Sequence, residues 1–228
     1  SFTDSRLNSL RHIIFGGEAY PKSLLKKVFK VYGKRAQFYN VYGPTEATCM
    51  CSSYKVSKED FLNSDELCPL GKISGNFEWL IANMDTTGVG ELILEGPQIA
   101  NGYLNDNEKT SEKFEFSSSK TGVLKKSYRT GDLVKLNNKN YLMFVGRKDF
   151  QIKHMGYRIE LEEIELQLLK YFKLTEVSVV YKKCTTELNG RIIAFIVPEN
   201  SEMDRNSLNA FIMSLPKYMR PDEVKLLE

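Results

Sequence analysis

The spacing of apolar residues changes twice along the chain and predicts three kinds of structure. Residues 12–15 form a short apolar run that predicts a strand. Apolar positions at helical spacing follow, between Pro21, which suits the first turn of a helix, and the terminating Gly33. A second strand is predicted over residues 37–41. The order of strand, helix and strand is typical of an α/β layer.

From about Gly71 the apolar runs become short and are separated by Gly, Asn and Asp turns. Strands are predicted over 78–82, 91–95, 133–136 and 141–145. A short helix is expected over 108–114. This rhythm predicts a small, mostly antiparallel sheet or β-barrel-like sheet.

After Gly146 helical periodicity returns. Apolar side chains from Leu161 to Phe172 share one helical face, strands follow over 177–181 and 192–197, and a last amphipathic helix includes Leu208–Leu215. We therefore expect an α/β plus α+β fold. Its predicted domains are residues 1–147, which hold the α/β layer and the small sheet, and residues 148–228, a small α+β lobe.

Composition narrows the class of protein. The chain has 228 residues, of which 42% are hydrophobic and 27% charged, as in soluble globular proteins. Its apolar runs are too short to span a bilayer. The net charge of +3 is spread among mixed charges, so we expect no nucleic-acid partner and no membrane partner. The start lacks both Met and a signal-peptide pattern, which suggests a piece of a longer protein.

The cysteines indicate a reducing compartment. The chain contains Cys49, Cys51, Cys68 and Cys184, and their spacing matches no zinc site. We therefore expect reduced thiols in a cytoplasmic protein.

The stretch FYNVYGPTEAT, residues 38–48, carries the densest chemistry. A strand that ends at a Gly-Pro turn places the following side chains at the carboxyl edge of a sheet, where open α/β layers bind ligands. Tyr42 offers a flat face to a base, and Asn40 a carbonyl to an amino group. Thr45 can donate to a phosphate, and Glu46 can hold Mg²⁺ through one oxygen. A polar hairpin with a capping Thr is the alternative interpretation.

Two later stretches add charged groups. In YRTGDL, 128–133, Asp132 is expected just past a Gly turn at the start of a strand, where a carboxylate suits two vicinal hydroxyls. In GRKDFQIKHMGYRIELEEIE, 146–165, Arg147 and Lys153 mark a charged boundary suited to a hinge beside an anion. SSSKTG, 117–122, is interpreted as a mobile solvent loop because it lacks Walker spacing.

In this order the motifs resemble the adenylate-forming, AMP-binding enzyme superfamily. The resemblance is carried by FGGEAYP, NVYGPTEAT, GELILEGPQIANGYL, YRTGDL and GRKDFQIKHMGYRIELEEIE, followed by LPKYMRP. It covers nearly the whole chain and is strongest to amino-acid adenylation domains and D-alanine–carrier-protein ligases. It implies the C-terminal part of such an enzyme.

The resemblance implies a ligase that joins an acid to a thiol in two steps. With ATP and Mg²⁺ a carboxylic acid, here an amino acid, gives an acyl adenylate. A phosphopantetheine thiol of a carrier protein, or coenzyme A, then takes the acyl group. Between the steps the C-terminal lobe swings about a hinge.

The resemblance also assigns residues. The implied nucleotide-binding positions are Gly17, Glu18, Asn40, Tyr42, Thr45, Asp132 and Arg147. Among these, Thr45 would contact the α-phosphate and Asp132 the ribose hydroxyls, while Glu46 would hold the metal. The implied acyl pocket contains Ile14, Gly16, Val41 and Cys49, and Gly16 leaves space there. Asp149 falls where the family pivots, and Lys153 and Gly156 lie in the implied thiolation loop.

Departures from the family pattern matter as well. The phosphate loop and the substrate-binding Asp belong upstream of Ser1, and the catalytic lysine belongs beyond Glu228, so the 228 residues alone are expected to be inactive. The D-alanine type carries Cys where this chain has Gly16, which leaves the acid open. Besides the amino-acid ligase, an acyl-CoA or aryl-CoA synthetase and a non-catalytic nucleotide- or partner-binding remnant stay open.

Overall fold

The structure of the protein is a computed structural model, which describes residues 7, 9–62, 67–118, 124–182, 190–199 and 204–227. The chain forms two compact units, Ser1–Lys148 and Asp149–Glu228. The division falls one residue after the boundary that we placed between 147 and 148. Cys184 lies outside the described residues.

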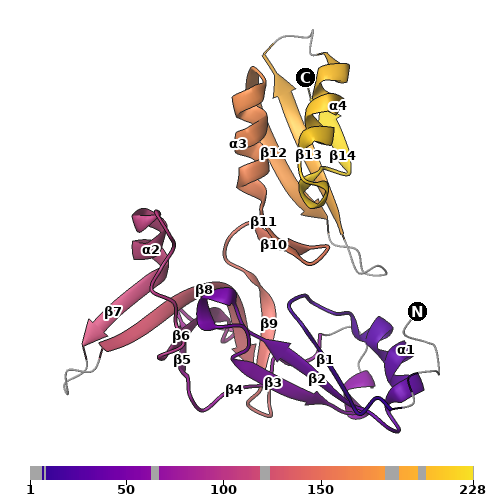
Figure 1. Ribbon diagram of the computed structural model, residues 1–228, viewed down its shortest axis with the longest axis vertical. Helices are drawn as coiled ribbons and strands as arrows, with labels where there is room; N and C mark the ends of the chain where they lie inside the picture. Colours follow the sequence, from indigo (N-terminus) through magenta and orange to yellow (C-terminus); the bar gives the residue numbers. More distant parts are fainter. Residues whose placement is uncertain are drawn as a thin grey trace. The chain divides into compact units, whose positions relative to one another are not determined.

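The first unit begins with a four-stranded sheet in the order β1-β2-β3-β4. Its elements are β1 (His12–Gly16), α1 (Lys22–Tyr32), β2 (Gln37–Tyr42), β3 (Ser52–Val56) and β4 (Lys72–Ile73). Strands β1 and β2 are parallel and are joined through α1, as the pattern of strand, helix and strand predicted (Figure 1). β3 and β4 continue the sheet antiparallel.

A second sheet of the first unit has the order β5-β6-β8-β7, with β9 paired to β8. Its elements are β5 (Glu78–Ala82), β6 (Gly90–Glu95), α2 (Asn107–Lys113), β7 (Phe114–Ser118), β8 (Leu124–Leu136) and β9 (Leu142–Arg147). All of these pairings are antiparallel. The predicted small, mostly antiparallel sheet is therefore confirmed, and among the described strands no pairing closes it into a barrel.

The long strand β8 corrects two predictions. Gly131 was expected to form a turn before a strand, but it lies inside β8 with φ of +71°. The pairing of β6 with β8 jumps from Glu91↔Leu133 to Ile93↔Arg129, which is a β-bulge around Gly131. In addition, Ser117 and Ser118 belong to β7 and not to a loop. The rest of SSSKTG, 119–122, lies outside the described residues.

Two apolar clusters stabilise the first unit. One lies under α1 and includes Leu25, Tyr32 and Phe38. The other includes Leu92 and Leu94 of β6 with Tyr42 at the end of β2. Tyr42 therefore belongs to the core as well as to the predicted site.

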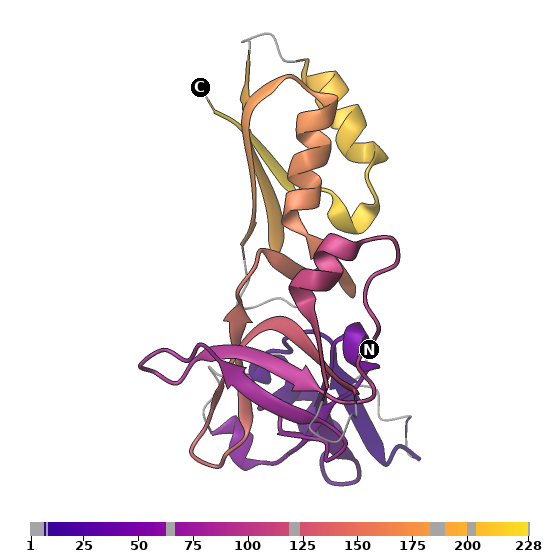
Figure 2. The same cartoon turned by 90° about the vertical axis from the view of Figure 1, so that its left-hand side faces the viewer.

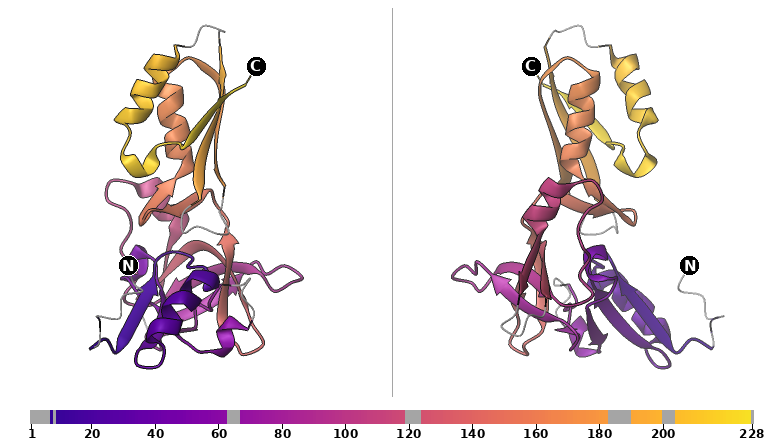
Figure 3. Two further views of the ribbon diagram at one scale, coloured as in Figure 1. Left: turned by 90° about the vertical axis from the view of Figure 1, so that its right-hand side faces the viewer. Right: turned by 60° about the vertical axis from the view of Figure 1, so that its left-hand side comes forward.

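The second unit is a helix-covered sheet preceded by a hairpin. The hairpin is β10 (Gln151–His154) with β11 (Tyr157–Glu160), followed by α3 (Leu161–Tyr171), β12 (Leu174–Lys182), β13 (Arg191–Pro198), α4 (Arg205–Ser214) and β14 (Glu223–Leu226). The sheet order is β12-β13-β14, with β12 antiparallel and β14 parallel to β13. Both helices lie on one face of this sheet (Figures 2 and 3). Its core includes Ile164, Leu168, Ile192, Ala194 and Ile196.

Candidate functional site

Three predicted nucleotide-binding residues meet in the first unit at the ends of β2 and β9 and the middle of β8. The Tyr42 hydroxyl donates to Asp132 Oδ2 at 2.5 Å, and Arg147 Nη1 donates to Asp132 Oδ1 at 2.8 Å. Asp132 is only 7% exposed. Both carboxylate oxygens are thus fixed, one by a phenol and one by a guanidinium.

The surroundings of Tyr42 keep it a hydrogen-bond donor. Burial, together with the negative charge of Asp132 and the hydrogen bond to it, raises the pKa of Tyr42 well above its ordinary value of 10.0. A carboxylate offers about four lone-pair positions, and Tyr42 and Arg147 each occupy one. Asp132 can therefore still accept hydrogen bonds from two hydroxyl groups of a ligand.

The bulge in β8 aims Asp132 at this cluster. Thr130 Oγ1 donates to the Leu92 carbonyl at 2.7 Å and accepts from the Asp132 amide at 3.0 Å. Arg147 Nη1 also donates to the Thr130 carbonyl at 2.9 Å. Backbone groups that the bulge removes from the strand ladder are therefore bound by side chains, which fixes the backbone on both sides of Gly131.

A second carboxylate, Glu46, lies in the 3₁₀ helix Thr45–Ala47 that follows the Gly-Pro turn. Glu46 is 6% exposed, and its Oε1 accepts from the Tyr103 hydroxyl at 2.6 Å. Burial raises the pKa of Tyr103, as do its hydrogen bonds to Glu46 and Tyr128, so Tyr103 stays protonated. Thr45, next to Glu46, is exposed, as the predicted hydrogen bond from its hydroxyl to a ligand phosphate requires.

The Glu46 carboxylate suits a Mg²⁺ ion that is bound together with a nucleotide. Within the described ranges no group of three His, Cys, Asp or Glu side chains is placed to hold a metal ion. Mg²⁺ keeps several waters and is commonly bound by one or two carboxylates plus substrate phosphates. The buried carboxylate of Glu46 matches that single-carboxylate role.

Asn40, Gly17 and Glu18 lie at the same end of the β1–β2 pair. Asn40 Nδ2 donates to the Pro69 carbonyl at 2.8 Å, so the oxygen of this amide is the atom suited to accept from an amino group. Gly17 has φ of +85° and is exposed, with no atom within 4 Å of the place where a Cβ would be. Glu18 is half-buried.

Three of the four predicted acyl-pocket residues lie on the paired strands β1 and β2. Ile14 is 61% exposed, and Gly16 lies opposite Val41 in the parallel register. The expectation that Gly16 leaves space is wrong, because a Cβ on it would be 2.1 Å from the Val41 carbonyl oxygen. Cys49 is exposed in a left-handed conformation with φ of 74°.

The remaining predicted residues belong to the second unit. Asp149 is its first residue, and its Oδ1 accepts from the Gln151 amide at 3.3 Å. Lys153 lies in β10, and Gly156 in the tight turn of the β10–β11 hairpin, with φ of +85°. No atom lies within 4 Å of a Cβ built on Gly156.

Sequence reasoning missed three residues of the first-unit cluster. Tyr103 holds Glu46, Thr130 holds the bulge, and Glu91 accepts from the Gly131 amide. Tyr103 and Glu91 lie in the stretch GELILEGPQIANGYL, in which no site residue was predicted. A signal was available, because a Glu within an apolar strand is rarely buried without a partner.

Comparisons with known proteins agree with these motifs. Residues 1–104 match the family model described as AMP-binding enzyme. The resemblance inferred from the motifs is thereby confirmed.

Relatives match along the whole chain. A D-alanine–D-alanyl carrier protein ligase of Staphylococcus aureus is 37% identical over 232 residues, which cover all of this chain and 45% of that protein. Bacitracin synthase 3 of Bacillus licheniformis is 33% identical over 231 residues, 99% of this chain and 4% of that protein. The chain therefore spans less than half the length of these curated relatives.

Solved structures show the same fold. An adenylation domain of Vibrio cholerae, AlmE, solved with glycyl-adenosine-5′-phosphate, has a TM-score of 0.80 at 24% identity and covers all of this chain and 43% of its own. PA1221, with adenylation and PCP domains, has a TM-score of 0.76 at 24% identity, again over all of this chain and 46% of its own. The predicted fold class is confirmed. Separately, no helix in the described residues is long and apolar enough to cross a membrane.

Proposed function

We propose that this chain supplies the nucleotide-binding part of an ATP-dependent ligase that activates an amino acid and passes it to a carrier-protein thiol. The observation that supports this most is the buried Asp132 carboxylate, held by Tyr42 and Arg147 with acceptor positions left over. A second support is the 37% sequence identity, over the whole of this chain, to a D-alanine–D-alanyl carrier protein ligase.

Asp132 accepts the two ribose hydroxyls in this proposal, while Arg147 keeps its charge in place. Tyr42 orients Asp132 through its hydroxyl and contacts the base with its ring. Asn40 accepts from the adenine amino group, and Gly17 and Glu18 lie against the base. Each charge-assisted hydrogen bond contributes roughly 1.5 to 3 kcal/mol.

At the reacting end Thr45 donates to the α-phosphate. Glu46, fixed by Tyr103, would hold Mg²⁺, which supplies charge neutralisation on the phosphates when it is bound. Activation of a carboxylate needs alignment and charge stabilisation more than it needs an acid or a base. The exposed Thr45 beside the buried Glu46 suits this division of work.

The acyl group in this proposal lies beside Ile14, Gly16, Val41 and Cys49. Because a side chain at position 16 would meet the Val41 carbonyl, this backbone does not suit the Cys of the D-alanine type. The second unit turns about Asp149, and its hairpin with Lys153 and Gly156 receives the pantetheine arm. The open space around Gly156 supports that part.

ATP–pyrophosphate exchange by the protein at its full natural length tests the proposal. The panel holds L- and D-amino acids, glycine, aryl acids and fatty acids, and the acceptor is either a holo-carrier protein or coenzyme A. Exchange with an amino acid followed by carrier loading is the expected result. Exchange with an aryl or fatty acid and transfer to coenzyme A would favour the acyl-CoA synthetase, and no exchange with any acid would favour a nucleotide-binding remnant.

A further inference from the structure

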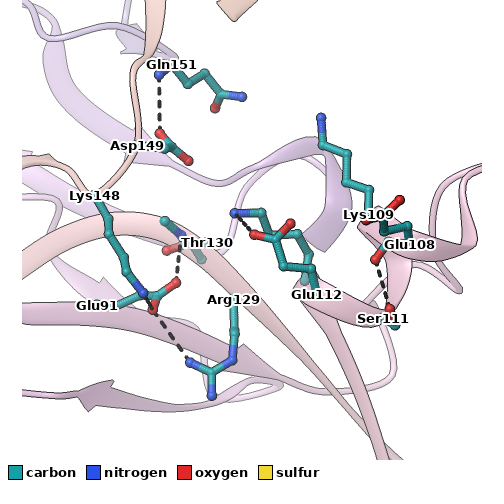
Figure 4. A network of polar contacts seen from close by, with 12 residues as sticks. Glu91, Glu108, Lys109, Ser111, Glu112, Arg129, Thr130, Lys148, Asp149 and Gln151 are labelled. Atoms are coloured by element: carbon teal, nitrogen blue, oxygen red, sulfur yellow. Dashed lines mark hydrogen bonds and ion pairs between the residues drawn. The ribbon is translucent and has the colours of Figure 1, made fainter. Parts of the chain in front are cut away.

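Glu91, in β6 of the first unit, is a buried carboxylate with three partners. Its side chain is only 5% exposed. Its Oε2 lies 3.4 Å from Lys148 Nζ and 3.6 Å from Arg129 Nη1, and Figure 4 shows it between these two cations. Both cations keep much of their side chains in solvent, 62% for Lys148 and 41% for Arg129.

The other oxygen of Glu91 binds the bulge itself. Oε1 accepts from the amide of Gly131 at 3.2 Å, one residue before Asp132. The carbonyl of the same Gly131 accepts from the Lys148 amide at 2.8 Å. Both polar backbone groups of Gly131 are therefore held, one by Glu91 and one by the last residue of the first unit.

Gly131 needs such support because its φ of +71° takes its amide out of the regular ladder between β6 and β8. A buried amide without a partner is unfavourable, and Glu91 is the acceptor that the structure supplies. A neutral acceptor would satisfy that amide equally well. The carboxylate adds attraction to Lys148, so the bulge and the end of β9 are drawn together at one point.

We propose that Glu91 is a positioning residue for the nucleotide site, since it fixes the Gly131 amide and thereby aims Asp132. This inference rests on the proposed function, in which Asp132 accepts the ribose hydroxyls. Glu91 itself touches no ligand in it. Its effect is confined to ligand groups that Asp132 binds.

Binding of AMP and of 2′,3′-dideoxy-AMP, measured by calorimetry on the full-length protein, tests the inference. Wild type is expected to prefer AMP by about tenfold or more, from at least one charge-assisted hydrogen bond. Glu91→Met, which removes the acceptor, should lower this preference at least about fivefold by weakening AMP, with dideoxy-AMP affinity nearly unchanged. Glu91→Gln keeps an acceptor oxygen for Gly131 and should retain most of the preference.

Arg129→Met is the matched control, because Arg129 pairs with Oε2 of Glu91 while the Gly131 amide binds Oε1, and it should leave the preference as in wild type. If Glu91→Met does not fold, Glu91→Asp replaces it, since it keeps the charge but retracts the acceptor, and it should show the same selective loss. A wild-type preference that survives both Glu91→Met and Glu91→Asp overturns the inference. No preference in wild type would instead overturn the ribose contact of the proposed function, and the role of Glu91 with it.

Discussion

The two units bury different kinds of side chain. Buried polar or charged residues of the first unit in the described ranges are Lys22, Asn40, Glu46, Ser52, Glu91, Thr130 and Asp132. In the second unit they are Gln151 and His154, both in the hairpin. The buried side chains of the sheet and helices of the second unit are those of Ile, Leu, Val and Ala, with no buried polar residue among their described positions.

This difference indicates that the first unit holds most of the buried polar side chains in fixed positions. Buried polar groups are unfavourable unless each finds a partner, so a region that keeps several must position them for another purpose. The groups whose pKa is raised by burial follow the same division, because Tyr42, Cys51, Tyr54, Cys68 and Tyr103 all lie in the first unit. In the second unit, Lys153 and Gly156, for which a role is proposed, lie on the β10–β11 hairpin and not on its sheet and helices.

Asp132→Ala should have the largest effect on the first unit. It leaves the Tyr42 hydroxyl and the partly buried Arg147 guanidinium without their carboxylate, at a cost of roughly 3 to 5 kcal/mol. Urea unfolding followed by fluorescence of Trp79, the one Trp of the chain, reports on this unit. Asp132→Asn keeps an acceptor for Tyr42 and should lose less stability, yet both variants should lose AMP binding. Unfolding midpoints equal to wild type would contradict this view of the cluster.

Leu168→Ala should destabilise the second unit by roughly 2 to 5 kcal/mol, since it opens a cavity at a fully buried position. The transition seen by Trp79 and the affinity for AMP should stay as in wild type if the units are separate in stability. The neighbouring Leu169, 42% exposed, provides the control, and Leu169→Ala should change little. A Trp79 transition that shifts with Leu168→Ala would break the comparison between the units.

Gly16→Ala should cost roughly 1 to 3 kcal/mol, because its Cβ would meet the Val41 carbonyl oxygen and the β1–β2 pair must shift. Gly75→Ala is the matched control, since no atom lies within 4 Å of a Cβ there. Substrate profiles from pyrophosphate exchange by the full-length protein should change with Gly16→Ala and not with Gly75→Ala. If the Gly16→Ala protein has the stability and the substrate profile of wild type, the placement of Gly16 in the acyl pocket is wrong.

The smallest effect at neutral pH concerns the buried thiols. Burial raises the pKa of Cys51 and Cys68 from 9.0 to about 12. Because the folded state keeps protons that the unfolded chain releases, their contribution to stability is fully present below about pH 9 and is lost as the pH rises toward 12. Cys68→Ala should therefore weaken the fall in unfolding free energy between about pH 8 and about pH 10.5. Cys49→Ser, at an exposed position, should leave that fall unchanged.

Local spacing determined much of the fold. Helices α1 and α3 lie where apolar periodicity placed them, because each buries one face in its own unit and that face repeats at the helix period. Strand β5 was predicted over the same residues, 78–82, as a short run bounded by turn residues. Short strands such as β3, β7 and β14 were not predicted. These strands have only four or five residues, which is too short for an alternation of apolar and polar residues that would distinguish them from loops.

The motifs predicted Tyr42, Glu46, Asp132 and Arg147 as site residues, and that role stays a prediction. The contacts between these residues and their partners were not predicted. Tyr42 and Asp132 are 90 positions apart, and Glu46 and Tyr103 are 57 apart. Nothing local states that a phenol will meet a carboxylate over such separations, because the pairing is set by the sheets that carry them.

The bulge at Gly131 was decided by tertiary structure alone. In the sequence, Thr-Gly-Asp has the composition of a turn, and a turn was predicted. Pairing with β6 on one side and β9 on the other keeps the chain extended, and the two extra residues of β8 become a bulge. Only then does Glu91, 40 positions away, become the acceptor for an amide that has left the ladder. A β-bulge is a property of two strands together, and a single strand's sequence does not contain it.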